Sequence, residues 1–113
     1  MARPLTRCND HFRRAVRRLP LGVSSNFRYW GDDKTLYVKR GRGPRVWDLD
    51  DNEYVDYRLG YGPVILGHCH PEVDAAARKG QEVGTVFALS TEREVVVAEL
   101  IHEMVPAAEL VRF

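Results

Sequence analysis

The fold is decided by GPVILGHCHP, residues 62–71, which follows VWDLDDNEYVDY, residues 46–57, after a short gap. The earlier run ends in residues 53–57, whose side chains alternate with the period of two that a half-buried strand requires. The later run ends at Pro71, which suits the first position of a helix because no N–H is needed there. The chain therefore changes from strands to helices across these two runs.

Short strands are expected on the N-terminal side of this change. Three segments have strand-forming side chains, and turn-forming residues separate them at 41–44 and at 50–52. In the second turn, Asp51 and Asn52 tolerate the positive φ that a tight turn needs. The pattern predicts an antiparallel meander of residues 36–39, 45–49 and 53–57.

A helix is expected before the meander, over about residues 10–19, and Pro20 ends it. Its apolar side chains recur at the spacing of one helix face and are Phe12, Ala15, Val16 and Leu19.

Two more helices are expected after the meander. The first runs from Pro71 to about Glu82, and the second starts at a capping box formed by Thr91 and Glu94. The second helix is predicted to bury Val97, Leu100, Ile101 and Met104 before Pro106 ends it. The tail, residues 109–113, is typical of the start of a strand.

Composition sets broad limits on function. With 113 residues and 44% hydrophobic content, the chain can bury a modest core. Cys8 and Cys69 lie far apart, in no disulfide or metal spacing, which favours a reducing compartment. No apolar run approaches the roughly 18–20 residues that cross a bilayer, and the N-terminus has no signal-peptide core. We therefore expect a cytoplasmic protein without a membrane segment.

The charge is uneven although its total is nearly balanced, at 17 basic and 16 acidic residues. Residues 1–20 hold six arginines and one acid, Asp10. Such an arginine-rich start is also found in organelle transit peptides and nucleic-acid-binding arms. The segment has no serine, and Phe12 is its only aromatic residue, so a solvated helix face is favoured and no nucleic acid is expected as a partner.

Three short sequence patterns could form a metal or phosphate site, but each has a simpler structural explanation. Residues 68–70, His-Cys-His, offer metal ligands, but adjacent residues rarely converge on one ion and no second cluster completes a tetrahedron. Residues 48–51 resemble the front of a calcium loop, but its glycine and its distant glutamate are missing, so turn acids are favoured. Residues 41–43, Gly-Arg-Gly, lie between strands and not before a helix, so a hairpin explains them better than a phosphate site. No metal is expected.

Four segments resemble, in order and in register over residues 11–113, the N-terminal part of class III aminotransferases, which depend on pyridoxal phosphate. Residues 12–23 are similar to the family's leading helix and glycine turn, and residues 47–57 to its W-D-V-D-G-N-x-Y-I-D-Y meander. Residues 62–71 match G-P-x-I-L-G-H-x-H-P, and residues 90–113 follow P-T-E…E-L-I…V-P into a V-R-F strand. Within the family the resemblance is strongest to glutamate-1-semialdehyde 2,1-aminomutases.

The resemblance implies an α/β fold, the N-terminal fragment of a fold-type-I transferase. Residues 1–66 would form part of the small domain, with the helix, a substrate loop and the meander. Residues 67–113 would begin the large, cofactor-binding domain, which is truncated here. Complete family members form a Schiff base between pyridoxal phosphate and a lysine, with the cofactor as electron sink. They are expected to act as homodimers.

Carried over by position, Ser25, Arg28 and Tyr61 are the predicted substrate-binding residues. Arg28 matches an arginine that binds the substrate carboxylate, a role that suits a planar, two-pronged guanidinium. Ser25 matches a neighbouring serine, and Tyr61 stands where the aminomutases place a tryptophan that covers the site. Without the family match, Arg28 would be read as a solvated loop residue and Tyr61 as a core aromatic.

Departures from the pattern keep the substrate open. Asn26 replaces a proline, residues 60–61 replace Ser-Trp, and Asp51 replaces the turn glycine. Conversion of glutamate 1-semialdehyde to 5-aminolevulinate is the first expectation, and transfer from a β- or ω-amino acid is the alternative.

The chain is not expected to be catalytic alone. Lys34, Lys39 and Lys79 are its only lysines, and none has the Schiff-base context. No catalytic or cofactor-binding residue is therefore predicted within it. A stand-alone, non-enzymatic α+β interaction module remains the alternative.

Overall fold

The computed structural model describes residues 3–113. The chain forms two compact units, of which the first ends at Asp74 and the second comprises Ala75–Phe113. Among the helices described, none has the length and apolar character that crossing a membrane would require. The predicted domain boundary between residues 66 and 67 stays a prediction.

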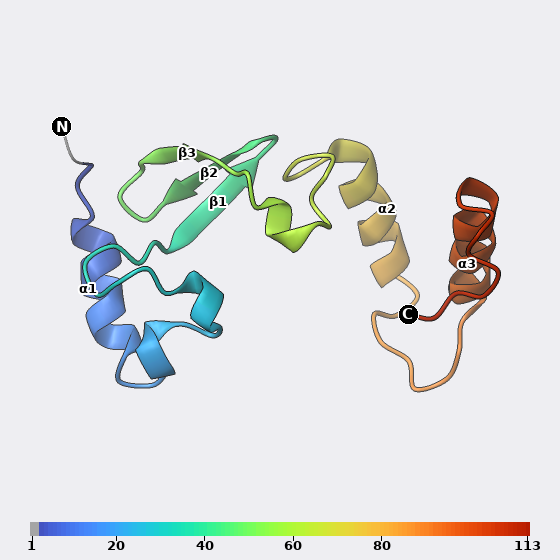
Figure 1. The fold of residues 1–113 in the computed structure, drawn as a ribbon, viewed down its shortest axis with the longest axis horizontal. Coiled ribbons are helices and arrows are strands. Elements are labelled where there is room, and N and C mark those ends of the chain that lie inside the picture. The colour runs from blue at the N-terminus through green and yellow to red at the C-terminus, as the bar shows by residue number, and fades with distance from the viewer. Residues whose placement is uncertain (1–2) are drawn as a thin grey trace. The chain divides into compact units, whose positions relative to one another are not determined.

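The first unit contains a three-stranded antiparallel sheet in the order β1-β2-β3 (Figure 1). Its strands are β1, Val38–Arg42, β2, Arg45–Asp48, and β3, Glu53–Val55. In register, Gly41 lies opposite Val46, and Val46 lies opposite Tyr54. The predicted meander is confirmed, and Asp51 has the expected positive φ, 66°.

The first strand was misplaced by the sequence pattern, which ended it at residue 39 and assigned Gly41 to a turn. In the structure β1 continues to Arg42 and includes Gly41. A Cβ on Gly41 would lie 2.6 Å from the His68 ring. Gly41 is thus a strand residue that leaves room for a side chain from a distant segment.

Helix α1 is Thr6–Ala15, which starts and ends about four residues earlier than predicted. Its N-cap residue, Leu5, contributes no side-chain cap. Instead, the Asp50 carboxylate accepts hydrogen bonds from the amides of Arg7 at 2.8 Å and Cys8 at 2.9 Å. These are the amides that an N-cap side chain usually satisfies, so a residue from the β2–β3 turn fixes the helix start.

The buried face of α1 differs from the predicted one. Cys8 and Phe12 are buried, whereas Val16 and Leu19 are 45% and 41% exposed. The earlier start brings Cys8 to the face of Phe12, one helical turn away. Phe12 packs against Gly22, where a Cβ would lie 2.9 Å from the ring and where φ is +67°.

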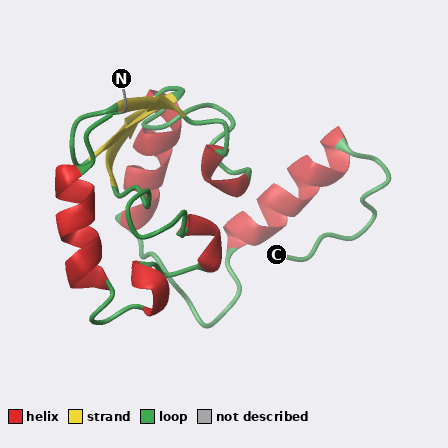
Figure 2. Ribbon diagram, turned by 60° about the vertical axis from the view of Figure 1, so that its left-hand side comes forward, coloured by secondary structure: helices red, strands yellow, loops and turns green. Residues whose placement is uncertain are grey.

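The second unit contains most of α2, Pro71–Gln81, and all of α3, Glu92–Met104. Pro71 opens α2, as predicted, and the capping box of Thr91 and Glu94 is present at the start of α3. Figure 2 shows both as red helices joined by a green loop. Gly80 is buried, and the space of its missing side chain holds the Arg93 guanidinium.

Two predictions for the second unit are wrong. The apolar stripe of α3 is not buried, and Leu100 and Met104 are 49% and 73% exposed. Residues 109–113 form no strand. A strand needs a neighbouring strand for its backbone hydrogen bonds, and the apolar stripe of a helix needs an apolar surface to pack against. The residue pattern within one segment supplies neither of these partners.

Candidate functional site

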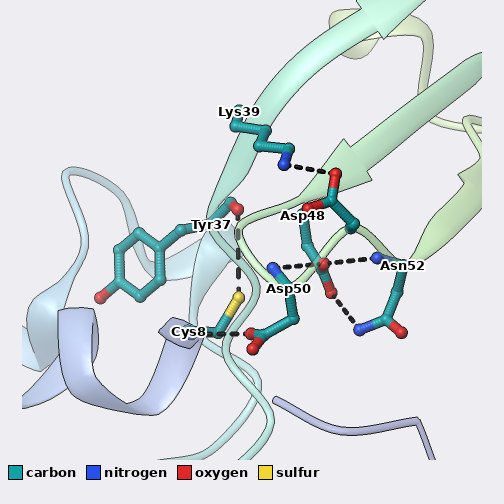
Figure 3. Close-up of polar contacts among 7 residues, drawn as sticks. Cys8, Tyr37, Lys39, Asp48, Asp50 and Asn52 are labelled. Atoms are coloured by element: carbon teal, nitrogen blue, oxygen red, sulfur yellow. Dashed lines mark hydrogen bonds and ion pairs between the residues drawn. The ribbon is translucent and has the colours of Figure 1, made fainter. Parts of the chain in front are cut away.

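One cluster in the first unit has the composition of a metal site. The Cys8 sulfur and carboxylate oxygens of Asp48 and Asp50 lie within 4.8 Å of one another (Figure 3). The oxygens already have partners, however. Asp48 Oδ1 accepts from the amides of Asp50 and Asn52, and Oδ2 accepts from the Asn52 side chain and the Tyr54 hydroxyl, each at 2.9 Å.

The cluster is therefore explained as structural. Asp48 is fully buried and holds the β2–β3 turn, while Asp50 caps helix α1. Burial is the largest influence on Cys8 and raises the pKa of its thiol, which keeps the sulfur protonated and disfavours it as a metal ligand. The expectation that these acids shape a turn is confirmed for Asp48 and Asp50.

Residues 68–70 lie in three different surroundings. His68 Nε2 lies 2.7 Å from Asp56 Oδ2, and the Cys69 thiol donates to the Gly41 carbonyl at 3.4 Å. The His70 carbonyl accepts from the Asp74 amide in the first turn of α2. The first two contacts attach this segment to the sheet and to the loop after β3.

A pocket in the first unit has a volume of about 570 Å³. It lies between α1, the 3₁₀ turn Asn26–Arg28, the start of β1 and the loop after β3. Its lining is mostly apolar and aromatic, with two arginines, and comprises His11, Phe27, Arg28, Trp30, Leu36, Tyr37, Val38, Leu49, Asp56, Arg58, Gly60 and Tyr61.

Aromatic rings from two distant segments meet at one edge of this pocket. The Phe27 and Tyr61 rings are 6.0 Å apart and inclined at 58°. The Arg58 guanidinium lies 5.0 Å from the Trp30 ring centre and 5.7 Å from that of Tyr61. Both distances fall within the range of cation–π attraction.

The backbone beside this edge is strained. Four consecutive residues, 59–62, have positive φ, and two of them, Leu59 at 51° and Tyr61 at 65°, are not glycine. Such conformations cost roughly 1–3 kcal/mol each and persist where surrounding contacts enforce them. The structure therefore holds Tyr61 at the pocket edge against a local backbone preference.

The charges of the pocket are mainly positive. Asp56, its one acid, is already engaged, with Oδ1 accepting from the amides of Arg58 and Leu59 and Oδ2 facing His68. Burial raises the pKa of the Asp56 carboxyl, but the hydrogen bonds from His68 and the two amides outweigh burial and hold it below its ordinary value. Asp56 thus stays charged, and neither Arg28 nor Arg58 forms an ion pair within residues 3–113.

Of the three predicted site residues, the structure brings two together. Arg28 and Tyr61 line the pocket, whereas Ser25 precedes the 3₁₀ turn and accepts the Arg28 amide through its carbonyl at 2.9 Å. Sequence reasoning missed Trp30 and Arg58. Arg58 lies three residues before Tyr61, and this spacing was the available signal.

Comparison with known proteins identifies the family. The model of class III aminotransferases matches residues 28–113. The chain belongs to this family. A glutamate-1-semialdehyde 2,1-aminomutase from Natranaerobius thermophilus is 43% identical over 104 residues, which cover 90% of this chain and 24% of the relative. The chain thus spans about a quarter of the length of such relatives.

Solved structures agree with this class III assignment. An omega-transaminase from Sphaerobacter thermophilus is 36% identical with a TM-score of 0.76, covering 86% of this chain and 22% of that one. A glutamate-1-semialdehyde aminomutase from Pseudomonas aeruginosa is 28% identical with a TM-score of 0.73 and the same coverage. The fold is that of an N-terminal fragment of these α/β enzymes, as predicted.

Pyridoxal phosphate, the cofactor that the class III family implies, is not matched by the residues described here. No lysine lines the pocket, and Lys39 is paired with Asp51 on the sheet surface. The pocket offers guanidinium groups and aromatic rings, which suit a substrate carboxylate and its cover but not a Schiff base.

Proposed function

We propose that residues 1–113 form the substrate-binding side of a pyridoxal-phosphate-dependent class III aminotransferase or aminomutase. Arg28 binds the carboxylate of an amino-acid substrate, and Tyr61 covers the bound substrate. The observation that carries this proposal is that Arg28 and Tyr61, 33 residues apart in sequence, line one pocket in which Arg28 has no acidic partner.

The physical basis is the geometry of the guanidinium. Its planar fork can donate two parallel hydrogen bonds to a carboxylate, and aromatic side chains line the same pocket. Ser25 has a supporting role in this proposal, because its carbonyl holds the Arg28 amide at the end of the 3₁₀ turn.

The leading substrate is glutamate 1-semialdehyde, isomerised to 5-aminolevulinate, and the aminomutase relative supports it. The second candidate is a β- or ω-amino acid that gives its amino group to a keto acid. It is favoured by the omega-transaminase likeness and by Tyr61 and Gly60 in place of Trp and Ser. An isomerase needs no added keto acid, whereas a transaminase does, so this requirement separates the two.

We also propose the division into a small-domain part, residues 1–66, and a large-domain part, residues 67–113. The complete enzyme would supply the Schiff-base lysine and act as a homodimer. Cys8 and Cys69 are free thiols, which suits the cytoplasmic location expected from the sequence.

The test replaces Arg28 by lysine in the complete enzyme that carries this chain. Arg28→Lys keeps the charge but loses the two-pronged geometry, at a cost of roughly 1.5–3 kcal/mol. At about 1.4 kcal/mol per tenfold, kcat/KM for carboxylate substrates should fall roughly 10- to 150-fold. Amines without a carboxylate should be little affected.

Arg45→Lys is the control, since Arg45 pairs with Glu53 on the sheet and does not line the pocket. If Arg28→Lys left amino-acid turnover intact, or impaired amines equally, the carboxylate-binding role of Arg28 would be wrong.

A further inference from the structure

Arg58 connects the two segments that form the aromatic edge of the pocket. Its Nη1 group donates to the Tyr61 hydroxyl at 2.8 Å and, more weakly, to the Phe27 carbonyl at 3.4 Å. The same guanidinium lies against the Trp30 ring. One side chain therefore contacts Phe27 and Trp30, which lie on either side of the predicted carboxylate-binding Arg28 in sequence, and the Tyr61 ring that is predicted to cover the substrate.

We propose that Arg58 is a positioning residue that holds Tyr61 over the pocket and thereby sets its selectivity for carboxylate substrates. This proposal rests on the proposed function, because it takes Arg28 as the carboxylate anchor. Arg58 acts through Tyr61 and is not itself assigned a contact with the reacting atoms.

The location of Arg58 suits this role. Its amide donates to Asp56 Oδ1 at 2.9 Å, and the same oxygen accepts from the Leu59 amide at 3.1 Å. The other Asp56 oxygen is held by His68. The base of the Arg58 side chain is thus anchored to the sheet side of the pocket, and only its outer end is committed to the aromatic edge.

The strained backbone explains why such a residue is needed. Leu59 and Tyr61 both adopt positive φ, which side chains other than glycine disfavour, so the loop requires contacts that enforce this conformation. Tyr61 is 58% exposed, and one face of its ring environment is formed by Phe27, 6.0 Å away. The hydrogen bond between the Arg58 guanidinium and the Tyr61 hydroxyl is the contact that fixes the outer end of that ring.

A guanidinium is better suited to this task than an ammonium group. It is planar, so it can lie against the Trp30 ring while its edge donates to two oxygens in fixed directions. Lysine at this position would keep the charge but lose this combination of stacking and paired donation. Arg58→Lys should therefore behave as an impaired variant.

The experiment is a double-mutant cycle between Arg58→Gln and Tyr61→Phe in the complete enzyme, with KM and kcat measured for carboxylate and non-carboxylate amino donors. Each single variant should raise KM for carboxylate donors about fivefold, the worth of one hydrogen bond, and change kcat much less. The double variant should lose no more than the larger single effect, because both single variants remove the same Arg58–Tyr61 hydrogen bond.

Arg40→Gln is the matched control. Arg40 also lies against a tryptophan, with its guanidinium 3.7 Å from the Trp47 ring centre, but it does not line the pocket. This variant should leave KM for both donor classes unchanged. Losses in Arg58→Gln and Tyr61→Phe that multiply, to about 25-fold together, would overturn the proposal, as would equal losses for both donor classes.

The Arg28→Lys variant tests the proposed function independently of the role of Arg58. If Arg28→Lys has no effect on carboxylate donors, the carboxylate anchor is wrong, whatever Arg58 does. If the enzyme transfers no amino group, the coupling is measured by thermal unfolding instead. Non-additive shifts in Tm for Arg58→Gln and Tyr61→Phe support the positioning contact, and additive shifts overturn it.

Discussion

The start of helix α1 offers the sharpest stability test, because its cap comes from a residue more than forty positions away. The Asp50 carboxylate accepts the amides of Arg7 and Cys8, which have no acceptor within the helix. Replacing Asp50 by alanine removes both hydrogen bonds and the negative charge. We expect α1 to fray at its N-terminus and the first unit to lose stability.

The size of the loss follows from the contacts. Loss of a cap costs about 0.5–2 kcal/mol, and loss of a negative charge at a helix N-terminus costs about 0.3–1 kcal/mol. Asp50→Ala should therefore lower the free energy of unfolding by about 1–3 kcal/mol. Asp50→Asn keeps one acceptor oxygen and should cost about 0.5–1 kcal/mol.

Urea unfolding followed by tryptophan fluorescence measures this loss, since Trp30 and Trp47 both lie in the first unit. At a slope of about 1 kcal/mol per molar, the midpoint for Asp50→Ala should fall by about 1–3 M. Asp10→Ala is the control, because Asp10 lies on the same helix but forms only an exposed pair with Arg13. A shift for Asp50→Ala no larger than that of Asp10→Ala would refute the capping argument.

Two further predictions concern the segment around His68. Gly67→Ala should cost about 2–4 kcal/mol of unfolding free energy, because the φ of Gly67 is +87° and a Cβ there would lie 2.9 Å from the Gly43 backbone. Gly43→Ala should cost only about 1–2 kcal/mol, the cost of its positive φ, because no atom lies within 4 Å of a Cβ at Gly43. Equal urea midpoints for these two variants would contradict the packing argument. The pKa of Asp56 is lowered in the folded state, so its contribution to stability is present above the unfolded pKa of about 3.9 and is lost as the pH falls through the folded value. Asp56→Asn should therefore flatten the dependence of the urea midpoint on pH below about pH 4, and an unchanged slope would count against the Asp56–His68 contact.

The sequence by itself determined the elements whose signals are local. Alternation of side chains predicted the meander, Pro71 predicted the first residue of α2, and Thr91 with Glu94 predicted the start of α3. Each signal acts between residues a few positions apart, through side-chain direction, a missing N–H or a capping hydrogen bond. The family resemblance, carried by motifs in register, also came from the sequence alone.

For the candidate site, the sequence supplied Arg28, Ser25 and Tyr61 through the family motifs only. The structure brought Arg28 and Tyr61 into one pocket and revealed Arg58, whose contacts lie 31 residues back, at Phe27, and three residues ahead, at Tyr61. The three-residue spacing from Tyr61 is visible in the sequence, but no periodicity marks the contact with Phe27, because that contact depends on how two loops approach each other.

Tertiary structure alone decided where α1 begins and where β1 ends. Asp50 fixes the helix start by capping it from the β2–β3 turn, and the pairing of Gly41 with Val46 extends β1 to Arg42. Tertiary structure also decided that the apolar residues on one face of α3 are not buried, although the sequence of this helix is amphipathic. Burial and long-range hydrogen bonds are properties of pairs of segments, so a pattern within one segment predicts which face is apolar but not what covers it.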